Sequence, residues 1–154
     1  MSGVKEKNKI LLVASAGGHW VQLNRLKPAF AGHECVYAST LPGCASQVAG
    51  CEFHLLPDAS LWNKFKLVWL ALKVFLLVLK VRPDVVVSTG AAPGFFAVLF
   101  GKKLGARTIW LDSIANPELM SKSGEKVRSY ADLWLTQWEH LASPDGPRFE
   151  GAVL

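Results

Sequence analysis

The stretch that most constrains the fold is an apolar run that ends in two glycines and a histidine. Residues 10–14 are all apolar, which is typical of a strand buried on both faces of a parallel sheet. The chain then passes through Gly17, Gly18 and His19 into residues 20–30, where apolar side chains recur at helical spacing. A strand, a glycine turn and a helix in this order open nucleotide-type α/β domains. Ligands there lie over the carboxyl end of the strand, against N–H groups at the helix start.

The turn lacks both standard phosphate-binding fingerprints. Neither Gly-x-Gly-x-x-Gly nor Gly-x-x-x-x-Gly-Lys-Ser/Thr occurs there, so neither a dinucleotide site nor a P-loop is predicted. His19 stands at the mouth of the turn instead, where an imidazole can act as a general base or contact a phosphate. The alternative is that His19 is an ordinary residue at the start of a helix.

The amino-acid composition indicates which kinds of molecule the chain is expected to contact. The chain has 154 residues, a hydrophobic fraction of 51% and a net charge of +5. The length suits one domain, residues 1–154, with its own core. The hydrophobic fraction predicts that apolar surface meets a membrane or a partner, and the charge favours an anionic one. Nucleic acid is not predicted, because the lysines stand among Trp, Leu and Val and form no arginine-rich face.

Cysteine usage and the first residues favour the cytoplasmic side of a membrane. Cys35, Cys44 and Cys51 are odd in number and include no Cys-x-x-Cys pair, so neither a disulfide scaffold nor a zinc site is predicted. The first nine residues contain no apolar stretch of the kind that a secretory signal needs. No cluster of metal ligands is visible in the sequence, and no bound metal is expected.

The segment at residues 61–81 combines an almost wholly apolar surface with a lysine every seventh residue. At roughly 30 Å for 20 helical residues, it is long enough to cross a bilayer. A crossing would, however, place the first strands and the strand expected at 84–90 on opposite sides of the membrane, where they could not share a sheet. We therefore predict a crossover helix with one face on the sheet and the other in the headgroup region.

The same segment supplies the predicted membrane contacts. The candidate membrane-facing residues are Trp62, Lys66, Trp69, Lys73 and Lys80. On a helix the three lysines form one narrow stripe that can reach anionic phosphates. The alternative is an ordinary core helix with a solvated lysine stripe.

A second strand and turn repeat the opening pattern. Residues 85–90 form the clearest buried strand and run into a small-residue turn at 90–94, ahead of an apolar helix at 95–104. Two such turns are expected to face one crevice. A strand at 108–111 then ends in Asp112-Ser113, a carboxylate and a hydroxyl well placed for a ligand. Asp112 could equally cap the segment that follows.

The remaining pattern completes an α/β domain. Strands are predicted at 34–39, 51–56 and 133–136, a helix after residues 121–124 that runs to about 131, and a strand-like tail at 148–154. Alternating strands and helices predict a parallel sheet. The candidate acceptor- or phosphate-binding residues are Gly17, Gly18, Ser88, Thr89, Gly90, Gly94 and Ser113.

Taken together, the motifs resemble a known family from Lys9 to the last residue. They are Ala16-Gly-Gly-His19, Ser88-Thr-Gly90 with Pro93-Gly94, Trp110-Leu-Asp-Ser113, Leu119-Met-Ser-Lys-Ser-Gly124, Ala131-Asp132, Gln137-Trp138 and the terminal Gly-Ala-Val-Leu. The chain resembles the membrane-anchoring, acceptor-binding subunit of the two-component UDP-N-acetylglucosamine transferase of asparagine-linked glycan assembly. It is closer still to the bacterial PssD-type proteins of capsule and exopolysaccharide synthesis.

The resemblance implies the N-terminal, Rossmann-like half of a split GT-B glycosyltransferase. This half would bind a polyprenyl-diphosphate-linked acceptor at the cytoplasmic face of the plasma membrane, as a peripheral or monotopic protein. A smaller partner subunit would bind the UDP-sugar in a heterodimer, so no cofactor is expected on this chain. The transfer would be inverting, with His19 or Asp112 removing a proton from the acceptor hydroxyl. Which sugar is transferred stays open, because the donor pocket would lie on the partner.

The chain departs from the family at its N-terminus, and two other functions are compatible with the sequence. Eukaryotic members carry an N-terminal transmembrane helix, whereas here only eight residues precede the first strand, so attachment would rest on the helix at 61–81. The first rival is a non-catalytic subunit that anchors or enhances a separate transferase. The second is an unrelated Rossmann-type enzyme that uses a nucleotide cofactor by itself.

Overall fold

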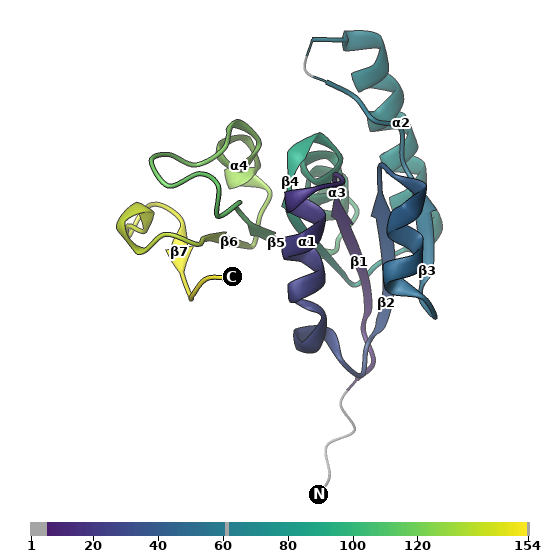
Figure 1. Ribbon diagram of the computed structural model, residues 1–154, viewed down its shortest axis with the longest axis horizontal. Helices are drawn as coiled ribbons and strands as arrows, with labels where there is room; N and C mark the ends of the chain where they lie inside the picture. The colour runs from purple at the N-terminus through teal and green to yellow at the C-terminus, as the bar shows by residue number, and fades with distance from the viewer. Residues whose placement is uncertain (1–5, 61, 154) are drawn as a thin grey trace, which may run out of the picture.

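The chain folds around one parallel sheet in the computed structural model, which describes residues 6–60 and 62–153 (Figure 1). The strands are β1 (Lys9–Ala14), β2 (Glu34–Ser39), β3 (Glu52–Leu55), β4 (Val85–Gly90), β5 (Arg107–Leu111), β6 (Leu133–Thr136) and β7 (Arg148–Phe149). They lie in the order β3-β2-β1-β4-β5-β6-β7, and every adjacent pair is parallel. The predicted Rossmann-like α/β sheet is confirmed.

Helices cover both faces of this sheet. The α-helices are α1 (Gly18–Arg25), α2 (Lys64–Val81), α3 (Ala91–Lys103) and α4 (Lys122–Lys126), and the 3₁₀ helices are η1 (Lys27–Phe30), η2 (Pro42–Val48), η3 (Val127–Ser129) and η4 (Glu139–Leu141). Alternate residues of β1 enter different core layers: Leu12 packs with α1, and Leu11 packs with α2 and α3. The unbroken apolar run of β1 thus reflects burial on both faces.

The strand order reverses between β1 and β4. The chain leaves β1 into α1 on one face of the sheet and leaves β4 into α3 on the other. In open parallel sheets the carboxyl edge at such a reversal forms a crevice that holds ligands. The starts of α1 and α3 therefore flank the edge at which open parallel sheets bind ligands.

The end of α1 and the start of α3 differ from the sequence prediction. The helix expected at 20–30 ends at Arg25 and continues as η1, whose first turn contains Pro28. Proline has no N–H to extend the α-helical ladder. The small-residue turn expected at 90–94 is also wrong, because α3 begins at Ala91, directly after Gly90.

The later boundaries differ as well. The helix expected between residues 124 and 131 begins earlier, as the short α4 at Lys122, and continues as η3. The strand expected at 148–154 is the two-residue β7. The helix expected at 61–81 begins at Lys64, where the Asn63 side chain caps it by accepting a hydrogen bond from the Lys66 N–H at 3.1 Å. Residue 61 of that prediction lies outside the described residues.

Candidate functional site

Two helix starts meet at the carboxyl edge of the sheet. Strand β1 leads through Gly17 into α1, and β4 leads through Gly90 into α3. The register of β1 with β4 pairs Ala14 with Gly90, so the exits of the two strands are neighbours. The first N–H groups of a helix have no intrahelical partner and carry partial positive charge. Two adjacent helix starts of this kind suit an anionic ligand such as a diphosphate.

His19 lies between these two turns, and two hydrogen bonds hold it. Its Nδ1 lies 3.1 Å from the Thr89 carbonyl oxygen, and the Thr89 hydroxyl donates to the His19 carbonyl at 2.5 Å. A carbonyl oxygen only accepts, so Nδ1 must carry the proton, and the lone pair of the neutral ring is then on Nε2. No residue within 6–60 or 62–153 forms a hydrogen bond with Nε2. The half-buried ring therefore presents a free basic nitrogen at the crevice.

Gly90 allows the ring of His19 to lie this close. A Cβ at position 90 would lie 2.3 Å from His19 Nδ1, and the φ of Gly90 is +145°. Both the missing side chain and the positive φ thus require glycine here. The sequence identified Gly90 as a turn glycine, but its contact with His19 is a tertiary one.

Some of the other small residues of the predicted site are exposed to solvent, and others are buried. Gly17 and Gly18 are exposed, and added Cβ atoms there would meet nothing within 4 Å, so their backbone is open to a ligand. Ser88 and Thr89 are buried. The Ser88 hydroxyl accepts from the Gly90 N–H at 3.1 Å, and a Cβ at Gly94 would lie 1.8 Å from it. Ser88 and Gly94 therefore support the turn from inside the protein.

Asp112 is buried behind the end of β5, with 2% of its surface exposed. Its Oδ1 accepts from the Trp110 indole N–H at 3.1 Å and from the Ser121 hydroxyl at 2.5 Å, and its Oδ2 accepts from the Ser121 N–H at 2.8 Å. The carboxylate is thereby engaged in holding the end of the 113–121 loop and the N-cap of α4. This geometry favours a structural role for Asp112, which holds the capping residue Ser121 and does not itself cap α4.

Ser113 belongs to a buried polar network that sequence reasoning missed. The Ser113 hydroxyl accepts from the Gln22 amide at 3.3 Å, and Gln22 Oε1 accepts from the Gln137 amide at 2.6 Å. Gln137 also donates to the Asp112 carbonyl at 2.9 Å and accepts from the Val153 N–H at 2.8 Å. The network joins α1 to the exits of β5 and β6. A glutamine in an amphipathic helix gives no signal of burial, so Gln22 could not be identified from the sequence.

Helix α2 has two apolar faces. Leu70, Val74 and Leu77 pack into the core, while the opposite side of the helix stays exposed. The exposed apolar side chains near or on the helix are Trp62 (95%), Phe65 (91%), Val68 (69%), Trp69 (50%), Leu72 (47%), Leu76 (49%) and Leu79 (42%). Figure 1 shows the first turns of α2 rising beyond the carboxyl ends of β1 and β2, on the same edge as the glycine turns.

The three lysines of the predicted membrane contact are exposed along one flank of this apolar face. Lys66, Lys73 and Lys80 all point away from the core, and the Lys73 ammonium lies 4.7 Å from the centre of the Trp69 ring. An ordinary core helix would not leave its outer face apolar, so the exposure pattern favours a contact surface. Among the described residues, no helix combines the length and apolarity needed to cross a membrane.

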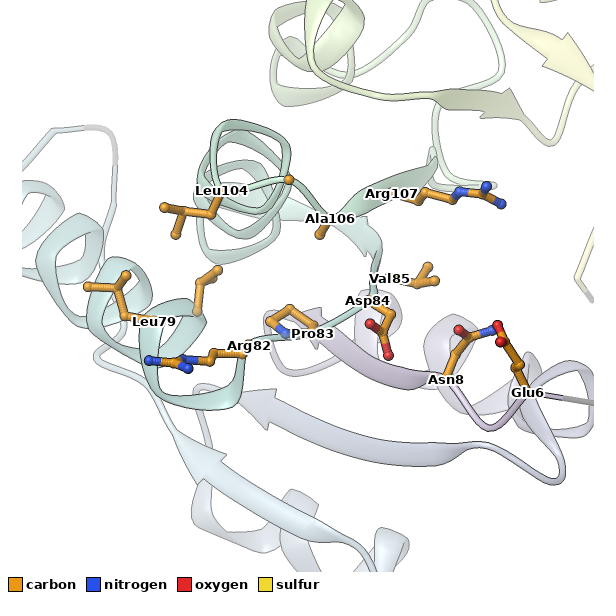
Figure 2. A pocket seen from close by; sticks show the side chains of 12 residues that line it. Glu6, Asn8, Leu79, Arg82, Pro83, Asp84, Val85, Leu104, Ala106 and Arg107 are labelled. Atoms are coloured by element: carbon orange, nitrogen blue, oxygen red, sulfur yellow. The ribbon is translucent and has the colours of Figure 1, made fainter.

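A cavity of about 910 Å³ lies at the opposite, amino edge of the sheet (Figure 2). Figure 2 shows Leu79 and Leu104 on one side of it and Asn8, Asp84 and Arg107 at the starts of the strands. None of the predicted site residues lines this cavity. Over the described ranges, no three histidine, cysteine or acidic side chains gather closely enough to hold a metal ion.

Comparison with known proteins relates the chain to glycosyltransferases. No model of a known protein family matches it. Over 173 residues it is 24% identical to the UDP-N-acetylglucosamine transferase subunit ALG14 of Mus musculus, covering 89% of this chain and 78% of the mouse protein. Its fold is similar to that of Acinetobacter baumannii MurG, with a TM-score of 0.73, 12% identity and coverage of 94% of this chain and 45% of MurG.

An epimerase shares the same fold. The UDP-N-acetylglucosamine 2-epimerase of Rickettsia bellii gives a TM-score of 0.68 at 14% identity, covering 88% of this chain and 40% of the epimerase. The chain thus spans less than half the length of these solved structures. The likeness confirms the predicted fold, that of the N-terminal domain of GT-B glycosyltransferases. In sequence, the chain resembles a glycosyltransferase subunit.

Proposed function

We propose that this chain is the acceptor-binding, membrane-associating subunit of a two-component inverting glycosyltransferase. The enzyme moves a sugar from a UDP-sugar to a polyprenyl-diphosphate-linked acceptor, in exopolysaccharide or capsule synthesis of the PssD type. A smaller partner chain supplies the donor pocket, so this chain needs no cofactor or metal of its own. Its place is the cytoplasmic face of the plasma membrane, as a peripheral or monotopic protein.

The observation that carries the proposal is the arrangement at the carboxyl edge. The starts of α1 and α3 lie side by side there with His19 between them, and the exposed apolar end of α2 rises above the same edge. A lipid-linked diphosphate has the two features that this edge accommodates, an apolar chain and a doubly phosphorylated head. The similarity to a transferase subunit supports the same assignment.

His19 is the proposed general base. With Nδ1–H bonded to the Thr89 carbonyl, Nε2 accepts the proton of the acceptor hydroxyl as that oxygen attacks the anomeric carbon of the donor sugar. The bond from that carbon to the UDP oxygen breaks, and UDP leaves with the bonding electrons. Inversion follows from attack on the face opposite UDP. Asp112 acts as a positioning residue, since its oxygens hold Trp110 and Ser121.

Reconstitution tests the proposal. Transfer from a radiolabelled UDP-sugar to a polyprenyl-diphosphate-sugar acceptor is measured with membranes that contain this chain, the candidate donor-binding chain, or both. We expect transfer only with both chains. Transfer by this chain alone would contradict the proposal, since it would require a complete donor site within these residues.

A non-catalytic anchoring subunit is the second candidate. The packing of His19 against Gly90 favours it, because a structural contact accounts for a histidine at this position without a catalytic role. The His19→Asn variant in the reconstituted pair separates the two functions. Loss of a general base lowers the transfer rate by about 10²–10⁴-fold. A pure anchor would retain the rate of the wild-type pair. Equal recovery of both chains in a pull-down controls for assembly.

A further inference from the structure

We infer that Cys35 and Cys51 form a reversible disulfide that ties the start of β2 to the start of β3. The inference concerns the chain by itself and holds whether or not the proposed transferase function is correct. The sequence predicted no disulfide scaffold, because the three cysteines include no Cys-x-x-Cys motif, and a single reversible bond is not such a scaffold. The two residues are separated along the chain and become neighbours only in the sheet.

The register of β2 with β3 begins one residue after each cysteine, and continuing it back by one residue sets the cysteines opposite each other. Val36 pairs with Glu52, and each cysteine immediately precedes one of these residues, Cys35 within β2 and Cys51 just before β3. Neighbouring strands lie about 4.8 Å apart. A disulfide forms between residues whose Cα atoms are roughly 4.4–6.8 Å apart. Continuing this spacing by one residue gives a separation that suits the bond.

Continuing the alternation of β3 by one residue also puts the two side chains on a common face. Cys35 packs against the same core layer as Tyr37 and Phe53, which are themselves paired across β2 and β3. Cys51 lies just before β3 and two residues from Phe53, so continued strand alternation extends the face of Phe53 to it. Burial and, second to it, the neighbouring Cys51 thiol raise the pKa of Cys35, which is consistent with two sulfurs close together.

Access distinguishes the three thiols. Cys51 is exposed, Cys35 is half-buried and Cys44 is buried in the core. A small disulfide in solution, such as oxidised glutathione, therefore reaches Cys51 first. The Cys51 thiolate attacks one glutathione sulfur and releases one glutathione thiolate. The Cys35 thiolate then attacks the Cys51 sulfur of this mixed disulfide and releases the second, so two protein thiols are oxidised while one glutathione disulfide is reduced.

The segment closed by this bond supports the candidate site. Thr40 lies within it and accepts a hydrogen bond from the Ala16 N–H of the glycine turn at 3.1 Å. Gln47 lies within it too and accepts from the Trp20 indole of α1 at 3.0 Å. Oxidation would restrict the part of the chain that holds the turn and the first helix in place.

Thiol counting on the full chain tests the inference. The reduced protein is incubated with oxidised glutathione, free thiols are alkylated, and intact masses are measured. We expect the wild type to lose two thiols without retaining glutathione, and Cys44→Ala to lose both of its thiols. Cys35→Ser should instead retain one glutathione on Cys51. Thermal melting provides a second readout: oxidation should raise the melting temperature of the wild type and leave that of Cys51→Ser unchanged.

Three results would overturn the inference. The first is a stable glutathione adduct on the wild-type chain with Cys35 still free. The second is loss of the Cys44 thiol from the wild-type chain, which would show that the buried thiol takes part in the bond. The third is a disulfide between two chains, seen as a doubled mass that reducing agent removes.

Discussion

At the residue scale, the fit of Gly90 against His19 determines whether the two turns can lie together. The glycine combines a φ of +145° with an approach that leaves no room for a methyl group. His19 is held from the other side by Thr89. The orientation of the proposed base therefore depends on a residue that supplies no functional group.

We predict that Gly90→Ala destabilises the protein and lowers transfer by the reconstituted pair. Backbone strain of this kind costs about 1–3 kcal/mol, and the added methyl group displaces the His19 ring. Urea unfolding and the transfer rate measure the two effects. Gly43→Ala is the matched control, because a Cβ there meets nothing within 4 Å. Equal behaviour of the two variants would contradict the proposed contact.

A second residue-scale prediction concerns alkaline stability. Burial, and after it the Cys35 and Cys51 thiols, raise the pKa of Tyr37 to about 12. An unfolded tyrosine ionises near pH 10. The folded state therefore keeps its proton while the unfolded state loses it, and the stabilisation, complete below pH ~10, is lost as the pH rises towards 12.

Tyr37→Phe should accordingly lose less stability than the wild type between pH 10 and 12. Urea midpoints measured across this range test the prediction, and Tyr130→Phe controls for removal of a phenol elsewhere. Parallel pH profiles for Tyr37→Phe and the wild type would contradict it.

At the element scale, the link between β5 and α4 depends on one carboxylate. Asp112 accepts three hydrogen bonds from Trp110 and Ser121, and Ser121 in turn caps α4 through the Gly124 N–H at 2.9 Å. The loop between them reaches the same edge of the sheet as the glycine turns.

We predict that Asp112→Ala lowers the free energy of unfolding by roughly 3 kcal/mol, since each buried donor left unpaired costs about 1–3 kcal/mol. Chemical denaturation measures the loss. A transfer rate that falls with no loss of stability would instead assign Asp112 to the chemistry. Ser121→Ala, which removes the cap but keeps the carboxylate, should cost about 1 kcal/mol.

Helix α2 carries the second prediction at this scale. Phe65→Ser with Val68→Ser should weaken binding to vesicles at least tenfold, because each apolar side chain contributes about 1.5–3 kcal/mol when it leaves water. Replacing Lys66, Lys73 and Lys80 by alanine should remove most of the preference for anionic lipid, at about 1 kcal/mol per lysine. Vesicle sedimentation with and without phosphatidylglycerol measures both.

Leu119→Ser serves as the control for α2, because Leu119 is 76% exposed but lies in the loop before α4. It should bind vesicles as the wild type does. If Leu119→Ser weakened binding as much as the α2 variant, the contact would not be specific to α2.

At the scale of the whole molecule, the two edges of the sheet have different properties. The carboxyl edge holds His19 and the two helix starts, while the cavity of about 910 Å³ lies at the amino edge. We predict that Arg107→Ala, at the amino edge, leaves transfer by the reconstituted pair unchanged. A rate as low as that of His19→Asn would show that the amino edge takes part in the reaction.

The sequence by itself determined the parallel α/β fold class and where most of the strands lie along the chain. The strands at Glu34–Ser39, Val85–Gly90 and Leu133–Thr136 were predicted at their observed bounds, because strands of a buried parallel sheet appear as apolar runs between turn residues. The glycine turn between β1 and α1 was also predicted, because two glycines between an apolar run and a helical pattern form a local sequence signal.

Only the tertiary structure decided which of these residues lie together. The contact of His19 with Gly90, the engagement of Asp112 by Ser121, the buried pair of Gln22 and Gln137, and the register of Cys35 with Cys51 all join residues distant in sequence. Such contacts depend on strand order and register, which local apolar patterns do not specify. The start of α3 at Ala91 was missed for a related reason, because positive φ values at Gly90 and Ala91 replace the expected turn.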